Sequence, residues 1–120
     1  DPQAIPLAHY AGTERVAAAV RDFGDWRSVY VGAPGLSAEF IHNLGRWSGC
    51  WCAAEPGDAV YASEHFVTIH ALYPGRKTLK LRTPSRVTDL TSGEVIAERT
   101  QTIEVELQRG QTRWFFTEPR

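Results

Sequence analysis

The stretch TIEVELQ, from Thr102 to Gln108, alternates apolar and acidic residues most strictly in this chain. In an extended strand Ile103, Val105 and Leu107 point to one side, and the two glutamates between them point to the other. A two-residue period of this kind predicts a strand with one face on a hydrophobic core and the other in solvent. The fold prediction starts from this strand.

The stretches on either side of it repeat the pattern. RGQ, which follows, is a hairpin turn signal, and TRWFFTE reads as the last strand. In KTLKL, Leu79 and Leu81 alternate with polar residues. Further short strands are predicted at AVYA, HFVTIHALY, RVTDL and EVIAE, separated by turn signals such as PGR and TSG. The chain after residue 57 is therefore expected to hold six or seven strands of antiparallel type.

The first half of the chain reads differently. RVAAAVRD (15–22) and RSVYVG (27–32) predict two strands joined by the turn FGDW. A single helix is predicted over residues 36–47, with Gly49 as its C-terminal cap. Its apolar residues fall on one helical face, which we expect to be buried against the sheet. This face consists of Leu36, Phe40, Ile41, Leu44 and Trp47.

These patterns predict an α+β fold, with one main helix packed on a mostly antiparallel, β-rich body. We expect a strand–helix–strand segment over residues 1–54. An antiparallel β-domain over residues 55–120 should be all-β and sandwich-like. The two parts are also compatible with one compact unit.

Composition narrows the class of protein. The net charge is −1, which gives no electrostatic footprint for nucleic acid or for an anionic membrane. No apolar run approaches the roughly 18 residues of a membrane helix. The chain contains no methionine, so we expect it to come from a longer or processed product. Its localisation therefore cannot be predicted from its first residues.

Both cysteines stand in GRWSGCWCAAEPGD (45–58), where Cys50 and Cys52 flank Trp51. CWCA reads as a short strand after the helix, so both thiols would share its core face. A structural zinc site needs two ligands beyond this pair, and no histidine stands at a recognisable spacing. We expect two free, buried, slowly reacting cysteines, with a metal or thiol site as the alternative.

No catalytic motif is apparent. The carboxylates are scattered along turns and polar strand faces, and no nucleophile–base motif or phosphate-binding loop occurs. Binding surfaces favour tryptophan and tyrosine, so exposed aromatic side chains are the remaining candidates for a carbohydrate site. The candidates are Trp26, Trp51 and Trp114.

A family resemblance extends over about 100 residues. The order GDWRSVYVGAPGLSAEFIHNLGRWSGC, GDAVYASEHFVTIHA and GRKTLKLRTPSRVTDLTSGEV resembles the C-terminal accessory region of large bacterial β-galactosidase-like glycoside hydrolases. The first half resembles the end of their amidotransferase-like α/β unit. The second half resembles their terminal β-domain, through its V-T-D-L-x-x-G-E turn and closing G-x-T-R-x-F strand. The matching motifs lie outside the catalytic barrel of that family, so the resemblance transfers no catalytic residue.

Three functions are therefore open. The resemblance implies a non-catalytic accessory or assembly domain of a carbohydrate-active enzyme, without a cofactor of its own. The second is a carbohydrate-binding module acting through exposed aromatic residues. The third is a small metal or thiol protein using Cys50 and Cys52. The expected partner is the rest of a larger chain or a homo-oligomer, with carbohydrate as a further candidate and neither nucleic acid nor membrane.

Overall fold

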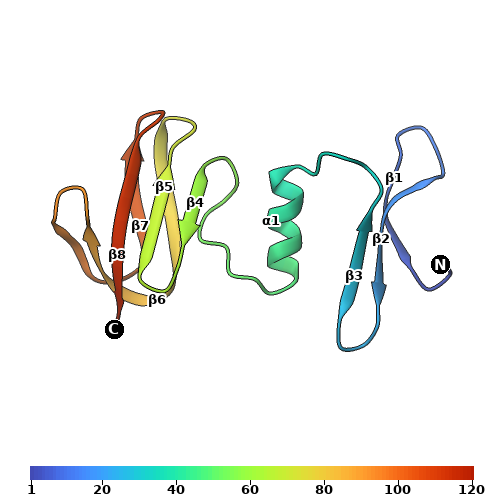
Figure 1. Cartoon of the computed structure of the whole chain (residues 1–120), viewed down its shortest axis with the longest axis horizontal. Helices are drawn as coiled ribbons and strands as arrows, with labels where there is room; N and C mark the ends of the chain where they lie inside the picture. The colour runs from blue at the N-terminus through green and yellow to red at the C-terminus, as the bar shows by residue number, and fades with distance from the viewer. The chain divides into compact units, whose positions relative to one another are not determined.

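The structure is a computed structural model that describes all 120 residues. The chain forms two compact units, Asp1–Ser37 and Ala38–Arg120, whose elements are labelled in Figure 1. The first unit contains β1 (Ile5–His9), β2 (Val16–Asp22) and β3 (Arg27–Val31). The second contains α1 (Ala38–Trp47), β4 (Ala59–Ala62), β5 (Phe66–His70), β6 (Gly75–Asp89), β7 (Val95–Leu107) and β8 (Thr112–Pro119). The predicted α+β class, with one helix and antiparallel sheets, is confirmed. The predicted division after residue 54 stays a prediction.

The first unit is a three-stranded antiparallel sheet in the order β1-β2-β3. The predicted strands β2 and β3 are confirmed, and the turn between them is closed by a hydrogen bond from Phe23 N to Trp26 O of 2.9 Å. Strand β1 was not predicted, because it is a short edge strand that contains Pro6 and lacks regular alternation. Only Ala17 and Ala18 are buried in this unit, so it has almost no hydrophobic core of its own.

The helix α1 forms where its period predicts it, starting at Ala38. The cap at Gly49 is also confirmed. Gly49 has a φ of 84°, and Cys50 N and Gly49 N donate to Gly45 O and Arg46 O at 2.9 and 3.0 Å. This is the hydrogen-bond pattern of a Schellman motif, in which glycine tolerates the left-handed conformation.

The predicted burial of the helix face is wrong. No residue of α1 is buried, and Ile41 is 55% exposed. The chain leaves α1 as an irregular segment, which does not cover the apolar face with a sheet. Amphipathic spacing indicates that a face needs an apolar neighbour, but it does not say that the neighbour lies within these 120 residues. With its ten residues, α1 is too short to span a membrane.

The predicted strand at CWCA is also wrong. Residues 50–54 are irregular; Cys50 is exposed, and Cys52 is half-buried. Both thiols are free, as expected. The segment reaches the sheet through Ala54, which packs on the core, and through a 2.6 Å hydrogen bond from Lys80 N to Ala53 O. These contacts come after the cysteines, so the predicted core position of Cys50 is not formed.

The second unit contains one antiparallel sheet in the order β4-β5-β8-β6-β7. Its strands number five rather than six or seven, because KTLKL and RVTDL are parts of β6, and EVIAE and TIEVELQ are parts of β7. The β6–β7 pairing shifts between Lys80↔Thr102 and Ser85↔Thr100. Extra residues on one strand bend it locally. In β6, the half before this shift pairs with β7 alone, whereas the half after it lies between β7 and β8.

The core of this unit lies between the two ends of the bent sheet. Leu79 and Leu81 of β6 and Ile103 and Leu107 of β7 are buried, and Val105 is half-buried against them, as the alternation predicts. They share one cluster with residues of β5 and β8, including Ile69 and Phe115. One bent sheet therefore supplies both layers of a sandwich-like body, and in Figure 1 β5 and β8 are drawn in front of β6 and β7.

Two ion pairs hold the ends of the strands. The carboxylate of Asp58 lies 2.7 Å from Lys77 Nζ, both side chains being 12% exposed, and it accepts the amide of Leu72 at 2.9 Å. Burial raises the pKa of Asp58, but the hydrogen bonds from Lys77 and the backbone, with the charge of Lys77, lower it further, below its usual value. The buried Asp89 pairs with Arg113 and accepts the amide of Thr91 at 2.8 Å. This second pair fixes the V-T-D-L turn between β6 and β7.

Candidate binding face on the five-stranded sheet

The side chains on the outer face of the sheet can be identified from those that are buried on its inner face. Val67 and Ile69 of β5 and Phe115 and Thr117 of β8 are buried. Strand alternation therefore directs the residues between them outward. The outward aromatic side chains on β4, β5 and β8 are Tyr61, Phe66, Trp114 and Phe116, which we call the aromatic face.

One row of this face runs straight across three strands. Tyr61 pairs with Thr68, and Thr68 pairs with Trp114. Neighbouring strands lie 4.7–4.9 Å apart, so Tyr61 and Trp114 start from backbone positions about 10 Å apart. Tyr61 is 73% exposed and Trp114 is 53% exposed. Two exposed aromatic rings thus lie on either side of a threonine.

The second row is more closely packed. Phe66 pairs directly with Phe116, and their rings meet at a centroid distance of 5.2 Å and an interplanar angle of 58°. Tilted aromatic pairs of this kind are stabilising beyond their buried area. The imidazole of His65 lies 6.2 Å from the Phe116 ring. This row forms a packed aromatic cluster along one side of the face.

The polar groups of the face are uncharged or held within the sheet. The Thr68 hydroxyl donates to Arg113 O at 3.0 Å, and His70 Nδ1 lies 2.8 Å from the Thr112 hydroxyl oxygen. Charges appear only at the far end of the face, where Arg86 pairs with Glu98 at 3.2 Å and Glu118 at 3.1 Å. The rows of aromatic rings themselves are neutral.

The three tryptophans that the sequence suggested for carbohydrate lie in three different places. Trp114 belongs to the aromatic face. Trp26 stacks on Phe23 in the β2–β3 turn, with ring centroids 4.2 Å apart, and Trp51 is half-buried in the segment after α1, with the Arg82 guanidinium 4.9 Å from its ring centre. Tyr61 and Phe66 were not among the predicted site residues. Their outward positions in AVYA and HFVTIH were readable, but the pairing of these strands with β8 was not.

The segment with the cysteines borders a cavity of about 330 Å³. The Glu55 carboxylate, which lines it, lies 3.2 Å from His42 Nε2 and 3.8 and 3.9 Å from Arg46 Nη1 and Lys80 Nζ. The thiol of Cys50 meets the Ser48 hydroxyl at 3.4 Å. No three histidine, cysteine or acidic side chains group closely enough to hold a metal ion. The geometry therefore gives the metal hypothesis no ligand set.

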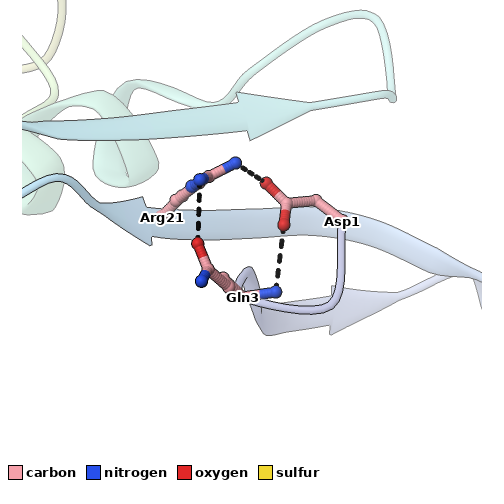
Figure 2. A network of polar contacts seen from close by, with 3 residues as sticks. All are labelled: Asp1, Gln3 and Arg21. Carbon is pink, nitrogen blue, oxygen red and sulfur yellow. Dashed lines mark hydrogen bonds and ion pairs between the residues drawn. The ribbon is translucent and has the colours of Figure 1, made fainter.

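The first unit carries one polar network, which Figure 2 shows. The Arg21 guanidinium pairs with the Asp1 carboxylate, donates to the Gln3 side chain at 2.8 Å, and lies 4.5 Å from the centre of the Phe23 ring. A cavity of about 340 Å³ adjoins it. These contacts fix the residues before β1 on the sheet, and they bring together no pair of carboxylates and no nucleophile.

Comparison with known proteins shows a likeness of fold. A solved β-galactosidase from Bacillus circulans sp. alkalophilus matches this chain with a TM-score of 0.63 and 20% sequence identity. The match covers 97% of this chain and 18% of the β-galactosidase, so the chain spans less than a fifth of the length of that protein. No protein-family model and no curated protein matches the sequence. The chain thus has the fold of a domain-sized part of a β-galactosidase.

Proposed function

We propose that the chain is a non-catalytic accessory or assembly domain of a larger carbohydrate-active enzyme of the β-galactosidase-like kind. In this proposal, the first half corresponds to the end of an amidotransferase-like α/β unit and the second half to a terminal β-domain. The fold likeness supports it, because it spans nearly the whole chain and only a small part of a glycoside hydrolase.

The observation that carries the proposal is apolar surface without a cover. In the first unit Ile5, Leu7 and Val16 are exposed, and only two alanines are buried. On α1, Ile41 is exposed as well. Large apolar surfaces on a soluble domain mark interaction sites, and a small sheet without a core depends on neighbours for its stability. The proposed neighbour is the rest of a parent chain or another copy in a homo-oligomer.

Two measurements on the purified chain test this function. A chromogenic β-galactoside should not be hydrolysed, and hydrogen exchange should find strong protection in β5–β8 but little in β1–β3. Activity that disappears when a single carboxylate is changed would overturn the non-catalytic role. Strong protection of β1–β3 in a monomer would show that this sheet is stable without a neighbour and would overturn the proposal that its apolar surface needs one.

A second candidate function is carbohydrate binding. The exposure of Tyr61 and Trp114 in one row of the sheet favours it. Of the suggested residues, Trp114 has the strongest structural support, whereas Trp26 and Trp51 remain separate candidates. The metal function of Cys50 and Cys52 has less support, because no cluster of three possible ligands includes them. Their thiol function has only the exposure of Cys50 in its favour.

A further inference from the structure

We infer that the aromatic face binds a neutral oligosaccharide chain, which stacks on Trp114 and Tyr61 and lies across β8, β5 and β4. This inference adds a ligand to the proposed accessory role, and only the choice of carbohydrate as that ligand rests on the proposed function. The site itself stands on the geometry of one sheet.

The chemistry of the face favours a sugar over a protein partner. The outward positions of β4, β5 and β8 hold mainly aromatic, hydroxyl and imidazole groups, with Ala59 at one edge and Glu118 at the far end. The exposed Leu90, whose amide donates to Trp114 O, is an aliphatic neighbour of the face. The surfaces proposed for assembly are different, since they expose aliphatic residues such as Ile5, Leu7 and Ile41. Aromatic faces provide flat apolar contact, which suits the C–H face of a sugar ring. Few polar groups are then needed to orient the ligand.

The polar groups lie between the rings, where sugar hydroxyls would reach them. The Thr68 oxygen uses its proton on Arg113 O, so its lone pairs are left to accept a hydrogen bond. His70 uses Nδ1 toward Thr112, which leaves Nε2 as its other hydrogen-bonding atom. Both lie on the strand between Tyr61 and Trp114.

Charge argues against the other ligands that stack on aromatic rings. Single-stranded nucleic acid needs a positively charged groove beside its stacking platform. The rows of this face carry no cation; Arg113, which precedes Trp114, is paired with the buried Asp89, and Arg86 is paired with two glutamates. An uncharged ligand therefore fits the neutral rows best. The spacing of about 10 Å between the Tyr61 and Trp114 positions lets each ring meet a separate sugar of one chain.

Affinity electrophoresis of the 120-residue chain tests the inference. The gels would contain β-1,4-galactan, arabinogalactan, xylan or hydroxyethyl cellulose, with polygalacturonic acid as the anionic control. At least one neutral glycan should retard the chain, and polygalacturonic acid should retard it less. Trp114→Ala and Tyr61→Ala should each weaken binding about tenfold. Tyr30→Ala is the matched control, because Tyr30 is about as exposed as Tyr61, at 70% against 73%, but lies in the other unit; it should bind as the unchanged chain does.

Each contrary result has a defined meaning. Retardation by none of the neutral glycans, or only by polygalacturonic acid, would overturn the inference. So would binding that Trp114→Ala and Tyr61→Ala leave intact while Tyr30→Ala removes it. Sedimentation of the same variants would show whether the face is instead a self-interface, since Trp114→Ala would then dissociate an oligomer. Circular dichroism of each variant separates loss of binding from loss of fold. None of these results depends on whether the chain belongs to a hydrolase.

Discussion

Replacement of Asp58 by asparagine should destabilise the second unit by about 3 kcal/mol. The Asp58–Lys77 contact of 2.7 Å corresponds to an attraction of about 6 kcal/mol at an effective dielectric constant of 20. Desolvation of two side chains that are only 12% exposed offsets much of this attraction. The substitution nevertheless leaves the Lys77 ammonium buried without its partner, and loss of one member of a buried pair typically costs about 3–5 kcal/mol.

The contribution of Asp58 to stability should fall as the pH is lowered. In the folded protein burial raises the pKa of Asp58, but hydrogen bonds from Lys77 and from the backbone amides of Leu72 and Tyr73 lower it by more. The pKa of Asp58 therefore lies below its usual value of 3.8. A lowered carboxyl pKa contributes stability above the unfolded value, and this contribution is lost as the pH falls through the folded value. The unfolding free energy of the unchanged chain should therefore approach that of Asp58→Asn as the pH falls below about 3.8.

Urea unfolding followed by tryptophan fluorescence at pH 7 and at pH 3 measures both effects. Glu104→Gln is the control, because its partner Arg76 lies next to Lys77 on β6 but both side chains of that pair are largely exposed. The control should change little, as exposed ion pairs do. A loss below about 1 kcal/mol for Asp58→Asn, or a difference between the two chains that persists unchanged at pH 3, would refute the reasoning.

Three further predictions concern single side chains. Phe115→Ala should cost about 3–5 kcal/mol in urea unfolding, because Phe115 is fully buried in the cluster of the bent sheet; a loss below about 1 kcal/mol would contradict that core. Ile41→Ala should lower the unfolding free energy of the chain alone by less than about 1 kcal/mol, since Ile41 is mostly exposed. A larger loss would indicate that this helix face is buried after all. Cys50 should react with a thiol reagent without denaturant, ahead of the half-buried Cys52, and equal protection of both thiols would show that the segment is packed.

Regular alternation was enough to predict much of the second unit. Leu79, Leu81, Ile103 and Leu107 are buried as their two-residue period requires. The number of strands was not predictable in the same way. The turn-like residues around Pro84 do not end β6 but form its bend, because pairing with β7 resumes at Ser85. A local signal for a break cannot distinguish a turn from an irregularity within one long strand.

Positions that depend on distant partners were predicted less well. The spacing of Ile41 and its neighbours gave a correct helix and a wrong burial, since the cover of a helix face is a tertiary property. Cys50 was expected in the core on the basis of residue type, yet it is exposed just after the helix cap. The aromatic face could be predicted only in part, because Tyr61 and Trp114 are more than fifty residues apart and meet through the strand order β4-β5-β8.

The most direct test of the proposed accessory role is to read the genomic coding sequence upstream of the codon for Asp1. The proposal predicts an open reading frame that continues upstream in phase and encodes the catalytic barrel of a β-galactosidase-like glycoside hydrolase. An initiation codon directly before this segment, with no catalytic domain in phase, would contradict it.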